Sequence, residues 1–131
     1  LEASPGSGKT TLVPPAILDA DLPAPRVIVV QPRRVAAWAV ARRMAELAGE
    51  PLGETIGFRV RGESRVGPRT RIEVVTEGVL LRFLDRDPFL EGIGAVVFDE
   101  FHERSVDADL ALTLCADVRE SVRPDLRLVV M

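Results

Sequence analysis

Short runs of β-branched and other apolar residues alternate along the chain with longer amphipathic segments. Runs that are apolar at nearly every position are typical of strands buried on both faces of a parallel sheet. Such runs occupy residues 27–30, 72–75, 95–98 and 128–131, and residues 55–60 are a further candidate strand. The alternation predicts an α/β fold, a doubly wound parallel sheet with right-handed crossovers. Ligands bind such sheets at the carboxyl ends of the strands.

Helical spacing of apolar residues predicts the intervening helices. Residues 34–48 form one, which places Trp38 in the core and ends at Gly49. Residues 77–84 form a short second helix with Thr76 as its N-cap, and residues 105–122 form a third that ends before Pro124. The apolar face of the third helix comprises Leu110, Leu114, Cys115 and Val118. A helix following residue 10 contains Pro14 and Pro15, so we expect it to be short or kinked.

Composition narrows the class of protein. The 131 residues, 47% hydrophobic and 28% charged, fit one globular domain, which we expect to be monomeric. A net charge of -3 argues against a generally basic nucleic-acid-binding surface, although not against a local one. Cys115 is the only cysteine, which fits a cytoplasmic setting. No apolar run approaches the roughly 20 residues of a membrane span, and the first residue is not Met, which suggests a piece of a longer protein.

The first ten residues, LEASPGSGKT, have the spacing of a Walker A phosphate-binding loop. Its glycines let backbone N–H groups point at a phosphate, and the following helix adds its positive end. Lys9, the only lysine, would reach the β- and γ-phosphates of a nucleotide, and the Thr10 hydroxyl would bind Mg²⁺. The predicted nucleotide contacts are Ser4, Pro5, Gly6, Ser7, Gly8, Lys9, Thr10 and Thr11. The alternative is an ordinary glycine-rich turn.

The run AVVFDE at residues 95–100 has the form of a Walker B segment, a buried strand that delivers a carboxylate to the ligand-binding edge. Asp99 would hold Mg²⁺ through water, and Glu100 would orient and activate the attacking water. The alternative is a strand end that happens to be acidic. A phosphate loop elsewhere in the same chain favours the functional interpretation.

Three further segments indicate which class of nucleotide enzyme this is. They are QPRRVAA at residues 31–37, TEGVLLR at 76–82 and DEFH at 99–102. The chain contains no Asn, so the Asn-Lys-x-Asp signature of small GTPases is absent. With the phosphate loop, these segments resemble motifs I, Ia, Ib and II of the DEAH-box helicases of superfamily 2, in that order and over the whole chain. Phe101 stands where the family name has Ala.

The resemblance implies a RecA-like P-loop NTPase domain over residues 1–131, the first of two such domains in the parent protein, cut short at both ends. It implies ATP and Mg²⁺ as cofactors, with Lys9, Asp99, Glu100 and His102 in the catalytic machinery. His102 would couple hydrolysis to the second RecA-like domain and to the bound strand. The implied contacts with single-stranded nucleic acid, expected to be RNA, are Arg33, Arg34, Thr76, Glu77, Gly78 and Arg61.

The expected function is therefore an ATP-dependent nucleic-acid helicase. Because arginine fingers would come from the second domain, we expect this piece alone to hydrolyse ATP very poorly. Two alternatives stay open: a nucleotide-gated clamp that binds RNA or protein without unwinding, and another P-loop ATPase motor. Without the resemblance, Arg33 and Arg34 would be solvated surface residues and Thr76 a plain helix cap. The basic stretch around Arg61 is likewise a strand contact or a solvated surface.

Overall fold

A computed structural model describes residues 9–19, 25–101 and 105–131. In this part of the chain six strands form one sheet in the order β3-β2-β4-β1-β5-β6. The strands are β1 (Arg26–Gln31), β2 (Ile56–Val60), β3 (Glu63–Arg65), β4 (Ile72–Thr76), β5 (Ile93–Phe98) and β6 (Arg127–Val130). Neighbouring strands are parallel except β2 and β3, which form an antiparallel hairpin. The predicted α/β fold with a mostly parallel sheet is confirmed.

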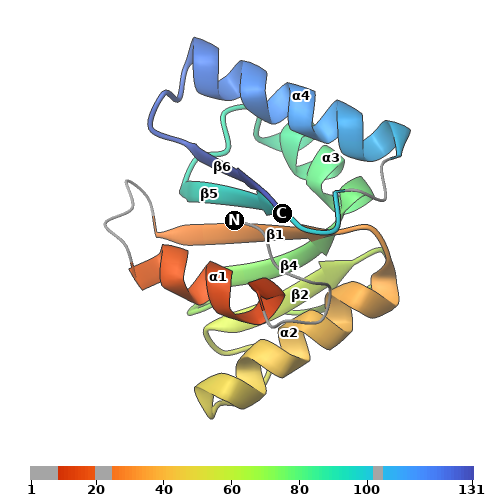
Figure 1. Ribbon diagram of the computed structural model, residues 1–131, viewed down its shortest axis with the longest axis vertical. Helices are drawn as coiled ribbons and strands as arrows, with labels where there is room; N and C mark the ends of the chain where they lie inside the picture. The colour runs from red at the N-terminus through yellow and green to blue at the C-terminus, as the bar shows by residue number, and fades with distance from the viewer. Residues whose placement is uncertain (1–8, 20–24, 102–104) are drawn as a thin grey trace.

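Two helices cover each face of the sheet (Figure 1). α1 (Lys9–Asp19) and α2 (Arg34–Ala48) lie on one face, and α3 (Glu77–Arg86) and α4 (Val106–Ser121) lie on the other. No helix in the described ranges is both long enough and apolar enough to cross a membrane.

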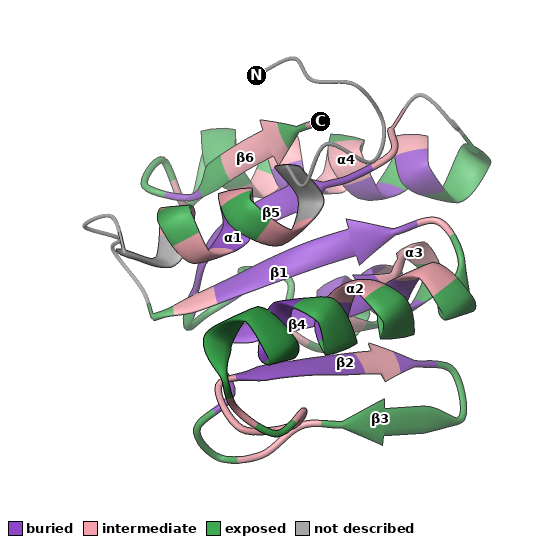
Figure 2. Ribbon diagram, turned by 60° about the horizontal axis from the view of Figure 1, so that its bottom comes forward, coloured by how far each residue is buried: buried purple, intermediate pink, exposed green. Residues whose placement is uncertain are grey.

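The centre of the sheet is β1, which is buried on both faces (Figure 2). Successive side chains of a strand point to opposite faces, so the same strand contributes to two cores. Val27 and Val29 belong to the core beneath α2, and Ile28 and Val30 belong to the core beneath α3 and α4. This double burial explains why residues 27–30 are apolar at every position rather than at alternate ones.

The predicted helix boundaries hold to within a few residues. Gly49 ends α2 with a φ of 71°, and the Ser105 hydroxyl accepts a hydrogen bond from the Ala108 N–H at the start of α4. Thr76 occupies the N-cap position of α3, although its side chain makes no capping hydrogen bond. α1 continues through Pro14 and Pro15 for 11 residues, so the two prolines do not end it.

Two expectations about the core were wrong. Trp38 is 40% exposed, and the Arg42 guanidinium lies 5.1 Å from its ring centre. The buried side of α2 carries Ala37, Ala41, Met44 and Ala45 instead, so Trp38 stays at the surface beside it. Leu110 is 46% exposed, because small side chains on α4 face the sheet. Those small side chains are Ala108, Ala111 and Cys115.

The hairpin of β2 and β3 was not predicted beyond its first strand. β3 is only three residues long and fully exposed, so it carries no apolar pattern. Gly57 allows the pairing, because a Cβ atom at this position would lie 2.3 Å from the carbonyl oxygen of Arg65. A glycine is therefore required where the returning strand passes close to β2.

Candidate nucleotide and nucleic-acid site

The segments singled out from the sequence meet at one edge of the sheet, where the parallel strands end. Gln31 is in register with Thr76 of β4, and Val30 is in register with Phe98 of β5. The residues that follow these strands therefore lie side by side. α1 also begins at this edge (Figure 1), so Lys9 and Thr10 form the first turn of a helix whose positive end faces the site. Residues 4–8, which complete the predicted phosphate loop, lie outside the described residues.

Asp99 is buried at the site and is held by hydrogen bonds. It is only 5% exposed, and its backbone N–H donates to the Val30 carbonyl oxygen at 3.0 Å. Its Oδ2 accepts a short hydrogen bond from the side-chain amide of Gln31, which is itself 1% exposed. Oδ1 is buried and has no hydrogen-bond partner among the described residues. The hydrogen bond to Oδ2 thus orients the Asp99 carboxylate, and Oδ1 stays available to a ligand.

The donor set fits the predicted Mg²⁺. Mg²⁺ takes oxygen ligands, keeps several of its waters and is usually held by one or two carboxylates together with nucleotide phosphates. A buried carboxylate oxygen without a partner, at the end of a parallel strand, is the kind of group that accepts a hydrogen bond from a metal-bound water. No three His, Cys, Asp or Glu side chains of the described ranges gather in a way that would hold a metal, so Asp99 would act together with nucleotide and water ligands.

Glu100 directly follows Asp99 and has a φ of 56°, a value that non-glycine residues rarely adopt. The chain therefore leaves the strand sharply at this residue. The turn is fixed by Phe101, whose N–H donates to the Met131 carbonyl oxygen at 3.2 Å. The Phe101 ring also packs edge-on against Phe98 with ring centres 6.1 Å apart. The side chain that replaces the Ala of the DEAH name is thus a packing residue. His102 lies outside the described residues.

The six predicted nucleic-acid contacts all lie along this same edge. Arg33 and Arg34 are exposed at the start of α2. Thr76, Glu77 and Gly78 surround the start of α3, and Gly78 is exposed there. Arg61 is exposed in the two-residue turn between β2 and β3. The structure brings these residues together, and their contacts with a strand stay predictions.

Two connections in the site were missed from the sequence. The Ser105 hydroxyl donates to Glu77 Oε1 at 2.8 Å, which ties the segment after Asp99 to the start of α3. Gln31 belongs to the segment QPRRVAA, but the sequence does not predict its contact with Asp99. The signal for Gln31 was available, because it is a polar residue that ends a fully buried strand and so needs a buried partner.

Comparisons with known proteins identify the family. A family model described as DEAD/DEAH box helicase matches residues 1–130.

The chain belongs to the DEAD/DEAH box helicase family.

It is 51% identical over 131 residues to the ATP-dependent RNA helicase HrpB of Escherichia coli (strain K12), covering 100% of the chain and 16% of HrpB. It is 43% identical over 131 residues to the DExH-box ATP-dependent RNA helicase DExH3 of Arabidopsis thaliana, covering 96% of the chain and 11% of that protein. The crystal structure of the Escherichia coli DEAH/RHA helicase HrpB superimposes with a TM-score of 0.91 at 51% identity, covering 96% of the chain and 16% of HrpB.

These matches confirm the predicted resemblance to DEAH-box helicases and the RecA-like fold of this DEAD/DEAH family member. The chain spans about a sixth of the length of HrpB.

Proposed function

We propose that this DEAD/DEAH chain is the first RecA-like, ATP-binding domain of an ATP-dependent RNA helicase. The observation that carries the proposal is the Gln31–Asp99 contact at the edge where α1 begins, which leaves one buried carboxylate oxygen without a partner among the described residues. The names of HrpB and DExH3 as ATP-dependent RNA helicases support ATP as the nucleotide and RNA as the strand.

In this proposal the residues at the nucleotide side of the edge share the work of phosphoryl transfer. Lys9 binds the β- and γ-phosphates, while the backbone of residues 4–8 and Thr11 surround them. Thr10 and Asp99 would hold Mg²⁺, which would supply positive charge to offset the charge that develops on the phosphates. Glu100 accepts a proton from the attacking water and orients it.

The strand binds beside the nucleotide, along the starts of α2 and α3. Arg33, Arg34 and Arg61 contact backbone phosphates, and so do Thr76 and Gly78 with the positive end of α3 behind them. Glu77 holds the α3 start against Ser105 through their 2.8 Å hydrogen bond. Phosphate contacts position a strand without reading its sequence, so this domain grips RNA of any sequence.

Movement along a nucleic-acid strand would require a second domain. A second RecA-like domain of the parent chain would close on the nucleotide, supply arginine fingers and take its signal through His102. Gln31 touches Asp99 on one side and precedes Arg33 and Arg34 on the other, so the nucleotide and strand contacts share one short segment.

Strand displacement tests the proposal. The full-length protein that carries this chain is mixed with an RNA duplex bearing a single-stranded tail, with Mg²⁺ and ATP, beside a Lys9→Ala variant. ATP-dependent displacement that Lys9→Ala abolishes supports a helicase. ATP-dependent RNA binding without displacement would instead indicate a clamp, and indifference to RNA would indicate another kind of ATPase.

A further inference from the structure

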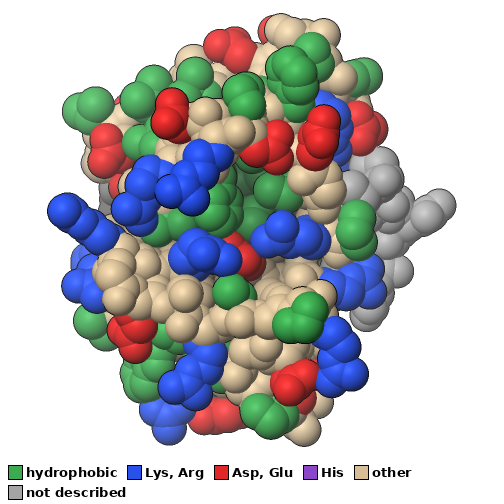
Figure 3. Space-filling model, turned by 180° about the vertical axis from the view of Figure 1, so that it is seen from behind, with side chains coloured by type: hydrophobic (Ala, Val, Ile, Leu, Met, Phe, Trp, Pro, Cys, Tyr) green, Lys and Arg blue, Asp and Glu red, His purple; other side chains and the backbone are tan. Residues whose placement is uncertain are grey.

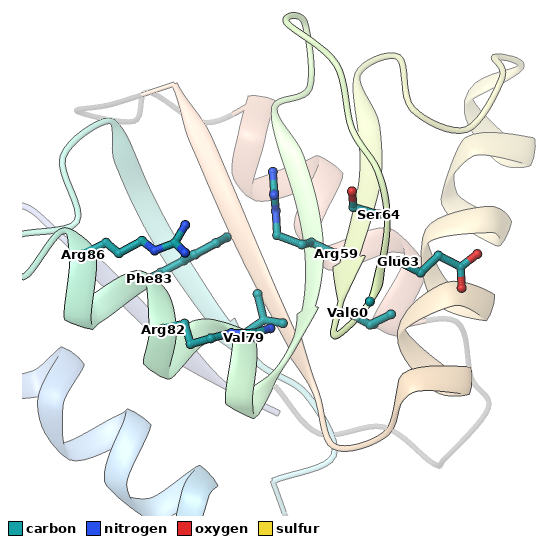
Figure 4. Close-up of a pocket in the computed structure, with 9 residues that line it drawn as sticks. Arg59, Val60, Glu63, Ser64, Val79, Arg82, Phe83 and Arg86 are labelled. Carbon is teal, nitrogen blue, oxygen red and sulfur yellow. The ribbon is translucent and has the colours of Figure 1, made fainter.

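A cavity of about 330 Å³ lies between α3 and the β2–β3 hairpin, on the part of the sheet face that neither α3 nor α4 covers. Figure 3 shows Arg side chains gathered around a hollow on the back of the molecule. The residues of the cavity that matter here are Arg59, Ser64, Arg82, Phe83 and Arg86. Figure 4 shows Phe83 and Arg86 pointing from α3 toward the side of the cavity that carries Arg59.

A buried acidic residue beside this cavity forms ion pairs with two Arg side chains. Glu73 on β4 is 1% exposed, and its carboxylate binds both Arg26 at 3.0 Å and Arg59 at 3.3 Å. The Arg59 guanidinium also lies 5.7 Å from the centre of the Phe83 ring. One carboxylate therefore holds two guanidinium groups, and Arg59 is oriented by the ion pair and by the aromatic ring.

The rim adds positive charge that no carboxylate of the described residues pairs with. Arg82 and Arg86 lie one turn apart on α3 and are exposed, and within the described part of the chain neither makes a hydrogen bond or an ion pair. Like charges at this spacing destabilise a helix slightly. Glu63 also lines the cavity, but its carboxylate points away from it (Figure 4). The surroundings of the cavity therefore carry a clear excess of guanidinium groups over carboxylates.

This cavity begins beside the strand-binding edge, at Gly62 and Val79, and extends away from it to Arg86. α3 begins at that edge with Glu77 and runs back along the sheet to Arg86, its last residue. At about 1.5 Å of rise per residue, Arg86 lies about 13 Å along the helix axis from Glu77. A group bound against Arg86 and Arg59 would contact the sheet face, not the ends of the strands.

We propose that this cavity binds a phosphate group, either free or within a nucleic-acid backbone that extends past the strand-binding edge. Guanidinium groups match phosphate oxygens in bidentate geometry, and the Ser64 hydroxyl adds a further donor. A single carboxylate would neutralise only one of the unbalanced charges, whereas a phosphate accepts several charge-assisted hydrogen bonds. The proposal does not depend on ATP hydrolysis or on unwinding.

Pyrophosphate is the probe, and calorimetric titration of the full-length protein is the measurement. All proteins in the titration carry Lys9→Ala, so that the phosphate loop does not contribute. We expect binding at one site, at least tenfold weaker when Arg82→Gln and Arg86→Gln are added. The matched control adds Arg42→Gln and Arg43→Gln, an exposed pair on α2, and binds as before. Arg82→Lys with Arg86→Lys keeps the charge and restores part of the affinity.

An RNA-binding measurement distinguishes a free phosphate compound from a phosphate of a nucleic-acid backbone. If the group belongs to a strand, the Arg82→Gln, Arg86→Gln variant also binds single-stranded oligouridylate with a salt dependence reduced by about 1 to 2 in log–log slope. If it is a free phosphate compound, only the pyrophosphate affinity falls. The proposal is overturned if the Lys9→Ala protein does not bind pyrophosphate, or if the α2 control pair loses affinity equally. Neither the pyrophosphate titration nor the RNA-binding assay requires ATP hydrolysis, so absence of ATPase activity would not change the interpretation of either one.

Discussion

Gln31 donates its side-chain amide to Asp99 Oδ2, which joins the last residue of β1 to the first residue after β5 across 68 positions of sequence. Both side chains are buried, and the other oxygen of Asp99 has no partner in the described part of the chain. Gln31 therefore positions the carboxylate expected to hold Mg²⁺.

Gln31→Ala should lower kcat/KM for Mg-ATP by about 10- to 100-fold in the full-length protein, because a hydrogen bond to a charged group contributes about 1.5–3 kcal/mol. The Mg²⁺ concentration needed for half-maximal activity should rise as well, which a purely structural role would not produce. Steady-state ATPase assays over a Mg²⁺ series check this. Unchanged Mg²⁺ dependence in Gln31→Ala would show that Gln31 does not position Asp99.

Gly78→Ala separates RNA contact from folding. A Cβ atom at Gly78 would meet nothing within 4 Å, and Ala favours a helix by roughly 0.5–1 kcal/mol over Gly. The variant should therefore fold at least as stably as the parent sequence. It should nevertheless bind single-stranded RNA several-fold more weakly, because the added methyl group would stand where we propose that a strand phosphate approaches the helix. Filter binding measures this, and full RNA affinity would remove Gly78 from the proposed interface.

Glu73→Gln should destabilise the centre of the sheet. The change leaves Arg26 and Arg59 without their shared charge, but both are more than a third exposed, so we expect a loss of about 1–2 kcal/mol rather than the larger cost of a fully buried pair. Glu46→Gln is the matched control, because Glu46 also binds two Arg side chains yet is half exposed. That control should change stability by less than about 0.5 kcal/mol. Hydrogen exchange of the β4 amides measures the loss of stability in each variant. Equal losses in Glu73→Gln and Glu46→Gln would contradict the expectation that the Glu73 ion pairs contribute more.

Cys115 should be chemically inert in the folded protein. Burial raises the pKa of its thiol from 9.0 to about 12. Below pH 9 the thiol is protonated whether or not the chain is folded, so it adds no pH dependence there. Between pH 9 and about 12 the unfolded chain loses the proton and the folded chain keeps it, so the free energy of unfolding falls as pH rises. Iodoacetamide at pH 8 should label Cys115 only after denaturation, and rapid labelling of the native protein would show that α4 opens.

The sequence was sufficient to predict elements whose signal is continuous. β1, β4 and β5 contain the apolar runs 27–30, 74–75 and 95–98, because both faces of these strands are covered, and that pattern is visible without a structure. Asp99 and Glu100 were found because they end such a strand. The order of the motifs along the chain then predicted that Arg33 and Thr76 lie at the same edge of the sheet as Asp99.

The rest depends on tertiary contacts that leave no local pattern. Trp38 has the spacing of a core residue, yet the buried side of α2 carries Ala37 and Ala41, and Trp38 stays 40% exposed. β3 forms because it pairs with β2, not because of its own composition. Glu73 is an acid within an apolar strand, and only the positions of Arg26 and Arg59 explain why its burial is tolerated.

The most direct test of the central claim is the ATPase rate of the full-length protein with and without single-stranded RNA, beside Glu100→Gln. We predict strong stimulation by RNA and its loss in Glu100→Gln, with ATP binding retained in that variant because Glu100 acts on the attacking water. An ATPase rate indifferent to RNA would contradict the account, since it would leave a nucleotide site without coupling to a strand.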